Sequence, residues 1–313
     1  MPTNLLMQPN VTTSCTPDAI AGVITQLAQT ASIEANVHDT RHLDTCTSLI
    51  PSGTRMYVSH LPGQRWEDTC TTSVAVHALG LKPVPHIPIR LIENDYALHT
   101  LLHTLASQSQ IEEVLLISGD YPQSKGPYSA VIDVLRNFPF ADYGIKALSL
   151  AGHPEGHPRV DLEHIRQAER EKCALAQARG FNTRLVTQFF FEADPFVSWS
   201  KDQMSHHQSA QRIAGIAGPA SLGTLFKFAL RCGVGPSVRA LGVRPGALLK
   251  LLGDYTPNDL VVALAQAKVQ TPSLFTGLHV FCFGGLVKSC QWLHAVSRGQ
   301  FELDMTQGLR MRT

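Results

Sequence analysis

Residues 183–195 of this chain read Thr-Arg-Leu-Val-Thr-Gln-Phe-Phe-Phe-Glu-Ala-Asp-Pro. The dense run of β-branched and aromatic residues at 184–191 predicts a buried strand, and the polar residues and proline after it predict a turn into a helix. Gln188 stands inside this run, where a buried amide without a partner would cost about 1–3 kcal/mol. We therefore interpret Gln188 either as a ligand-binding residue or as a core residue that bonds neighbouring backbone.

Eight short runs of this kind recur, and each is followed by a turn signal and a longer stretch, often with helical spacing. They are residues 32–37, 55–61, 84–90, 113–118, 145–151, 184–191, 212–217 and 278–283. Strands that alternate with helices form a parallel sheet. Eight of them predict an α/β fold, a single (β/α)8 TIM-type barrel.

The stretches between the runs fit this fold. We expect helices over 95–107, 128–137, 161–179 and 195–209, and several extra helices between 219 and 277, before the last strand, which begin at Ser221 and include 244–252 and 256–267. The prediction is one barrel domain over 1–313. Its N-terminal helical extension, 1–30, contains a helix over 18–29, capped by Thr16 or Asp18, that closes the barrel bottom, and its tail over 299–313 is flexible.

A doubly wound open sheet uses the same alternation and is the main competing fold. Its glycine fingerprint should follow an early strand, but Gly233-Val-Gly235 follows a helical segment and precedes Pro236, which favours a helix-ending turn. The pair Gly284-Gly285 follows the eighth strand. It fits a phosphate site at a helix N-terminus and a tight strand-to-helix turn equally well.

Composition narrows the class of protein. The chain has 26 Lys and Arg against 25 Asp and Glu, and this balance does not favour a nucleic-acid or membrane partner. Its seven cysteines form no CxxC pair, which does not favour a zinc site or a disulfide framework. Without a signal-peptide pattern or a long apolar run, we expect a cytoplasmic protein, and the sequence leaves homo-oligomerisation open.

Polar residues stand at the ends of five of the predicted strands: Glu34, His86, Asp120, His153 and Gln188. Strand ends of a barrel face one mouth, where catalytic groups collect. Burial should raise the pKa of Glu34 and keep a proton on it, as a general acid requires. The alternative is an outward-facing Glu34 or an ion pair, for example with Arg55.

Two segments carry a family resemblance. Residues 149–158, Ser-Leu-Ala-Gly-His-Pro-Glu-Gly-His-Pro, and the 183–195 segment together resemble the methylenetetrahydrofolate reductase family. Three shorter matches follow the family's order: Ser-Ile-Glu-Ala at 32–35, Val-Pro-His-Ile-Pro at 84–88 and Ser-Gly-Asp-Tyr-Pro at 118–122. The resemblance spans residues 31–294.

The resemblance implies a reaction, its cofactors and its residues. The reaction interconverts 5,10-methylenetetrahydrofolate and 5-methyltetrahydrofolate, with hydride from NADH or NADPH by way of FAD. Glu34 corresponds to the acid that helps open the bridging one-carbon unit. Asp120 would lie between flavin and pterin, and Gln188 would bind the pterin amide edge. The FAD contacts would come from His86, Ser118, Gly119, Asp120, His153 and His157.

Two positions depart from the family pattern and leave several functions open. Ser118 stands where bacterial members carry an Arg that helps hold FAD, and His153 stands where they carry Tyr. A branch of the family passes hydride directly between nicotinamide and folate. A non-catalytic folate or flavin binder and an enzyme for a different one-carbon carrier also fit the sequence. Asp120 suits a plain turn as well.

Two further patterns are given structural interpretations. His153 and His157 have the spacing of zinc ligands on a helix, but Pro154 and Gly156 oppose a helix there, so we predict no metal site. The three phenylalanines at 189–191 alternate through a strand, so at most two of them can face the site.

Overall fold

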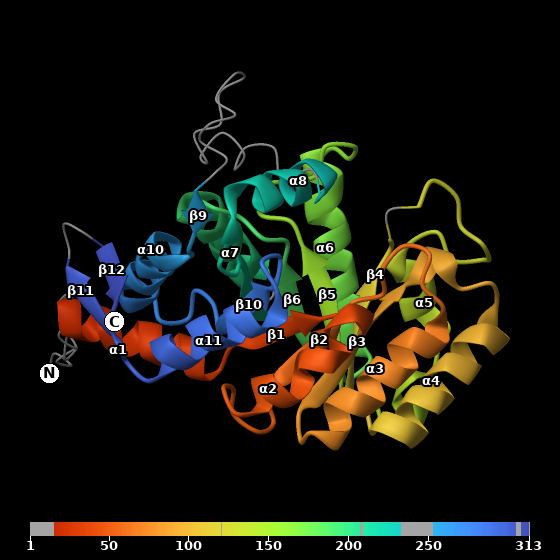
Figure 1. Cartoon of the computed structure of the whole chain (residues 1–313). Coiled ribbons are helices and arrows are strands. Elements are labelled where there is room, and N and C mark those ends of the chain that lie inside the picture. The colour runs from red at the N-terminus through yellow and green to blue at the C-terminus, as the bar shows by residue number, and fades with distance from the viewer. Residues whose placement is uncertain (1–15, 120, 207–208, 233–252, 305–307, 313) are drawn as a thin grey trace, which may run out of the picture.

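The computed structural model describes residues 16–119, 121–206, 209–232, 253–304 and 308–312. Eight parallel strands close into a barrel in the order β1-β10-β7-β6-β5-β4-β3-β2 (Figure 1). They are β1 (Ser32–Ala35), β2 (Arg55–Val58), β3 (Lys82–Pro88), β4 (Glu113–Ile117), β5 (Ala147–Gly152), β6 (Asn182–Thr187), β7 (Gln211–Ala217) and β10 (Gly277–Phe281). The predicted barrel is confirmed, and the open sheet is excluded because β1 pairs with β10.

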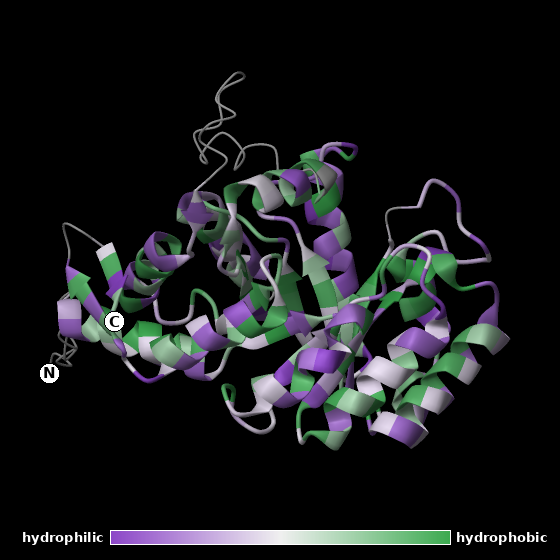
Figure 2. Cartoon of the chain, in the orientation of Figure 1, coloured by the Kyte–Doolittle hydropathy of each residue, from purple (hydrophilic) through white to green (hydrophobic). Residues whose placement is uncertain are grey.

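Helices cover the outside of the barrel between successive strands, and one more, α11 (Leu286–Ser297), follows the last strand. Those between β1 and β7 are α2 (Leu43–Thr47), α3 (Trp66–Ala78), α4 (Asp95–Ser109), α5 (Val131–Asn137), α6 (Leu162–Ala178) and α7 (Ala193–His206), with short 3-10 turns η1 (Val37–His42), η2 (Ile89–Leu91) and η3 (Phe140–Tyr143). In Figure 2 helices such as α4 carry both green and purple stretches, the pattern of amphipathic helices. None of the helices in the described part of the chain has the length and hydropathy for a membrane crossing.

The long connection before the last strand contains α8 (Leu222–Cys232) and α10 (Asn258–Gln270), as predicted, although α10 starts and ends later than expected. A small antiparallel pair, β8 (Ala220–Ser221) and β9 (Asp254–Tyr255), joins the start of this connection to the residues just before α10. The helix predicted over 244–252 and the glycine pair 233 and 235 lie outside the described residues.

Helix α1 (Pro17–Gln29) begins as predicted, because Thr16 accepts a hydrogen bond from the backbone N–H of Ala19 at 3.3 Å. It packs against α10 and α11, beside the barrel. This position differs from the expected one, in which the helix closes the barrel bottom. Thr30, directly after its last turn, lines a cavity at that end.

The C-terminal tail differs from the flexible segment that its polarity predicts. Strands β11 (Phe301–Asp304) and β12 (Gly308–Met311) pair antiparallel. Phe301 and Leu309 are buried, and α10 contacts β12. Apolar residues alternate with polar ones in both segments, so the side chains of one face are buried.

The Gly284-Gly285 pair forms the tight turn between β10 and α11. A Cβ atom at Gly284 would lie 2.0 Å from the carbonyl oxygen of Pro219, and Gly285 has φ +105°. Both conditions require glycine, which accounts for the pair as a turn.

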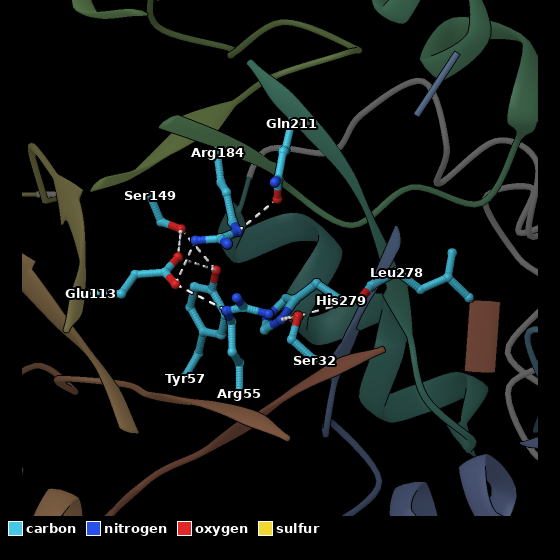
Figure 3. Close-up of polar contacts among 9 residues, drawn as sticks. All are labelled: Ser32, Arg55, Tyr57, Glu113, Ser149, Arg184, Gln211, Leu278 and His279. Carbon is cyan, nitrogen blue, oxygen red and sulfur yellow. Dashed lines mark hydrogen bonds and ion pairs between the residues drawn. The ribbon is translucent and has the colours of Figure 1, made fainter. Parts of the chain in front are cut away.

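Side chains fill the barrel interior. A buried apolar cluster consists of Tyr57, Val84, Leu115, Val186 and Ile213. Glu113, the first residue of β4, lies beside it and accepts hydrogen bonds from Arg184 at 2.7 Å and Arg55 at 3.0 Å (Figure 3). Arg55 therefore pairs with Glu113, and the alternative that it pairs with Glu34 is wrong.

Candidate functional site

A cavity of about 280 Å³ opens where the barrel strands end. Its lining comprises Glu34, Ser59, Leu61, His86, Leu115, Ile117, Ala151, His153, Val186, Thr187, Gln188, Phe228, Cys232, His279, Phe281 and Phe283. Four of the five polar residues predicted to converge therefore do so. The fifth, Asp120, lies outside the described residues. This is the end of a barrel at which active sites are built.

Glu34 is held in place by two neighbours that come from different strands. Its side chain is 21% exposed. The hydroxyl of Ser59, the residue after β2, donates to Oε1, and Nε2 of His279 on β10 lies 3.5 Å from Oε2. Ser59 and His279 lie beside Glu34 because β1 pairs with β2 on one side and with β10 on the other.

The pKa of Glu34 follows from this setting. Burial raises it, because the charged carboxylate loses water. The hydrogen bond from His279, the Coulombic interactions with the protonated forms of His86 and His279, and the hydrogen bond from Ser59 lower it, and the net pKa lies below the ordinary value. The expectation of a raised pKa is therefore wrong. It considered only the burial of Glu34, because the sequence does not show which residues contact the carboxylate.

His279 is a site residue that the sequence analysis did not select. Its side chain is 1% exposed, and its ring packs edge-on against Tyr57 at 4.6 Å and Phe281 at 4.7 Å between centroids. Its Nδ1 lies 3.0 Å from the hydroxyl of Ser32. A histidine in the apolar strand Gly277–Phe281 was itself the signal, because a buried imidazole needs polar partners.

His86 contributes a buried imidazole to the same wall of the cavity. Burial lowers the pKa of His86 to about 4, so the ring is neutral at pH 7. Its Nε2 has no hydrogen-bond partner among the described residues. A buried ring nitrogen of this kind is a candidate contact for a bound ligand.

Gln188 follows β6 directly, and its side chain is half-buried. The strand ends earlier than the sequence predicts, at Thr187, so Gln188 stands at the cavity edge and not in the core. Its Oε1 accepts a hydrogen bond from the backbone N–H of Phe189 at 3.1 Å. This bond fixes the amide orientation.

His153 is positioned by a buried carboxylate on α6. Glu169 accepts a hydrogen bond from the backbone N–H of His153 at 2.7 Å, and its other oxygen accepts bonds from Arg166 and Trp199. Burial raises the pKa of Glu169, but the His153 side chain, the hydrogen bond from Trp199 and the charge of Arg166 outweigh burial, and the net pKa is lowered. Glu169 therefore fixes the backbone of His153 in the cavity wall.

Three phenylalanines form the aromatic part of the lining, beside aliphatic residues such as Leu115 and Val186. The rings of Phe228 and Phe283 stack at 4.3 Å, and those of Phe281 and Phe283 at 5.6 Å. Among the residues 189–191, Phe189 packs on Phe283, and Phe190 stacks on Phe196 in the core. None of the three phenylalanines at 189–191 lines the cavity. Phe228 and Phe283 can present ring faces to a flat ligand.

Three predicted cofactor contacts do not line this cavity: Ser118, Gly119 and His157. Gly119 has φ +88°, and a Cβ there would lie 2.9 Å from Tyr121, so the glycine serves the turn after β4. The backbone N–H of Arg159 donates to Nδ1 of His157 at 3.3 Å, within the loop after β5. These loop residues follow the strand ends, where the period of a strand no longer sets their direction.

Metal ligands do not gather in the described part of the chain: no group of three or more His, Cys, Asp or Glu side chains is placed to hold an ion. The rings of His153 and His157 stand 6.2 Å apart between centroids and perpendicular, and His153 faces Glu169.

A larger cavity of about 490 Å³ lies at the opposite end of the barrel. Its charged lining consists of Arg55, Lys82, Glu112, Glu113, Lys146 and Arg184. Arg55 and Arg184 pair with Glu113, and Lys146 pairs with Glu112. We place the candidate site in the smaller cavity, because it contains an acid in contact with an imidazole.

Comparisons with known proteins add the following. No family model matches the chain, so the resemblance to the methylenetetrahydrofolate reductase family rests on the motifs alone. Dihydropteroate synthase (FolP) from Thermus thermophilus is similar in structure, with TM-score 0.47 and 10% identity over 86% of this chain and 93% of that chain. Its complex with 6HMPPP gives TM-score 0.46 and 9% identity over 86% and 91%. Likenesses at these identities concern the arrangement of the chain and not its chemistry.

The residues of the cavity suit flat heterocyclic rings, but the predicted FAD contacts do not gather there. The volume of about 280 Å³ is close to the lower end of the roughly 300–1,000 Å³ of typical ligand clefts. Three of the six predicted FAD contacts, Ser118, Gly119 and His157, lie outside the described lining. The described residues therefore do not fit FAD.

Proposed function

We propose that this protein binds a reduced folate at the carboxyl-terminal mouth of the barrel and interconverts 5,10-methylenetetrahydrofolate and 5-methyltetrahydrofolate. Glu34 carries the proposal, because it is an acid at the end of β1 in contact with an imidazole and faces a cavity with an amide and aromatic walls. The motif resemblance assigns the same position to the acid of the reductase family.

The residues divide the work as follows. Gln188 binds the amide edge of the pterin, and the rings of Phe228 and Phe283 pack against flat parts of the folate. Glu34 gives its proton to the nitrogen that the bridging carbon leaves, and the resulting iminium carbon accepts a hydride. A folate that covers the exposed side of Glu34 removes water there and raises the pKa, so the acid gains its proton with the substrate.

The hydride comes from NADH or NADPH. The family resemblance implies FAD as an intermediate carrier, but the described lining does not fit FAD. We therefore favour direct transfer, in which C4 of the dihydronicotinamide gives two electrons and a proton as hydride to the iminium carbon. The products are 5-methyltetrahydrofolate and the oxidised nicotinamide, so atoms and electrons balance.

The cofactor assignment predicts the colour of the protein. We expect the purified full chain to be colourless in the visible region and to oxidise NADH or NADPH when methylenetetrahydrofolate is added. The measurement is an absorption spectrum, followed by nicotinamide and then folate. A yellow protein that nicotinamide bleaches would restore FAD to the mechanism, and folate binding without turnover would indicate a binding protein.

Gln188 should contribute to folate affinity. Gln188→Ala should weaken binding of 5-methyltetrahydrofolate by about 1–3 kcal/mol, the cost of leaving hydrogen-bonding groups of the ligand unpaired. Calorimetric titration measures this loss. The control is Gln167→Ala on α6, where the amide makes an exposed hydrogen bond to Glu171. Equal affinity for the two variants would show that Gln188 does not touch the ligand.

A further inference from the structure

The ring of His279 is held by a chain of hydrogen bonds inside the barrel (Figure 3). The hydroxyl of Ser32 donates to the carbonyl oxygen of Leu278 at 3.3 Å and lies 3.0 Å from Nδ1 of His279. A serine hydroxyl has one proton and accepts through its lone pairs. With that proton directed at Leu278, the Ser32 oxygen is free to accept from Nδ1–H of His279, and we infer this tautomer.

This tautomer determines what faces Glu34. With its proton on Nδ1, a neutral imidazole presents the bare Nε2 to the carboxyl group, 3.5 Å away. The contact is then favourable in two forms, a carboxylic acid beside neutral imidazole or a carboxylate beside imidazolium. The two forms contain the same number of protons, so the last proton belongs to the pair and not to one residue.

We propose that His279 holds, together with Glu34, the proton that Glu34 delivers to folate, and that Ser32 fixes the His279 ring for this task. The inference rests on the proposed function and assigns positioning roles to two residues behind the acid. The proposal explains how Glu34, whose pKa its surroundings lower, can still deliver a proton: His279 holds that proton 3.5 Å away.

The steps balance as follows. The carboxylate of Glu34 first takes the Nε2 proton of the imidazolium form of His279, and the carboxyl group so formed gives that proton to the folate nitrogen. The ring returns to the neutral Nδ1–H tautomer, which Ser32 stabilises. Solvent restores one proton to the pair after the product leaves.

Four other ionisable groups lie near the pair: Tyr57 on β2, His86 on β3, Asp39 in η1 and Cys282 after β10. Burial raises the pKa of Asp39 and of the Cys282 thiol. Burial raises the pKa of Tyr57, so its hydroxyl stays protonated, and Glu113 and Ser149 bond it. Burial lowers the pKa of His86 to about 4, so that ring stays neutral.

The pH dependence of the folate reaction tests the proposal. In the parent, turnover should fall at high pH, where the pair loses its last proton. In His279→Gln, Glu34 alone must hold the proton, so this fall should begin at lower pH. The ratio of parent to variant turnover should then grow about tenfold per pH unit between the two limbs.

Ser32 gives a sharper version of the same test. Ser32→Ala should move the limb in the same direction by a smaller amount, and Ser32→Thr, which keeps a hydroxyl, should restore the parent profile. The matched control is Ser149→Ala, which removes another buried hydroxyl from the barrel interior, one bonded to Tyr57 and Glu113. Its pH profile should be that of the parent.

A measurement without turnover follows the ring itself. In protein labelled with ¹⁵N-histidine, the neutral form of His279 should be the Nδ1–H tautomer, and Ser32→Ala should give a mixture of tautomers. A parent ring in the Nε2–H tautomer would overturn the proposal, as would parent-like pH profiles in both His279→Gln and Ser32→Ala. If Glu34→Gln abolishes turnover while these profiles are unchanged, the proposed function stands and the role of His279 is wrong.

Discussion

Replacing Glu34 by Gln should slow the reduction of methylenetetrahydrofolate by about 10²–10⁴-fold, the usual contribution of a general acid. The amide has nearly the shape of the carboxyl group. Its oxygen can accept the Ser59 hydrogen bond, and its nitrogen can donate to Nε2 of His279, so the fold and the cavity should be retained. The amide cannot give up a proton at neutral pH.

Turnover and binding together separate chemistry from affinity. The rate is measured as nicotinamide oxidation that depends on folate, and the affinity for 5-methyltetrahydrofolate by calorimetry, where a change of a few-fold at most is expected. Asp39→Asn is a suitable control, because this nearby carboxylate caps the turn at Asn36 and does not line the cavity. A Glu34→Gln variant with turnover within a few-fold of the parent would show that Glu34 is not the acid.

Much of the barrel could be predicted from the sequence. Each strand is a dense apolar run that ends at a turn signal, and parallel strands of a closed sheet all end at one mouth. This rule alone places Glu34, His86, His153 and Gln188 around one cavity, although β1 and β6 are about half a barrel apart in the strand order.

The contacts between these residues could not be predicted in the same way. Glu34 meets His279 only because the first strand pairs with the last, across 245 residues of sequence. Burial of Glu34 was predictable, but the sign of its pKa shift depends on that contact. Loop residues such as Ser118 and His157 do not line the cavity, and the strand period, which ends before them, could not have placed them.

Replacing Glu113, the first residue of β4, should destabilise the protein far more than replacing its neighbour Glu112. Glu113 is buried and accepts hydrogen bonds from Arg184, Arg55, Ser149 and Tyr57 (Figure 3). Glu113→Ala should lower the free energy of unfolding by about 3–5 kcal/mol, because it leaves a buried charge without its partner. That charge is the guanidinium of Arg184, whose side chain is 11% exposed.

Glu112 supplies the matched control one residue earlier. Its carboxylate pairs with Lys146, and both side chains are well exposed, at 49% and 69%. Glu112→Ala should therefore change the free energy of unfolding by about 0–1 kcal/mol, as exposed pairs do. Urea unfolding followed by circular dichroism measures both variants. Glu113→Gln should fall between them, because its amide oxygen still accepts from one arginine while the second acceptor oxygen and the charge are lost. Similar small losses for Glu112→Ala and Glu113→Ala would mean that the arginines reach water at the open end of the barrel, and that the buried pair does not stabilise the fold.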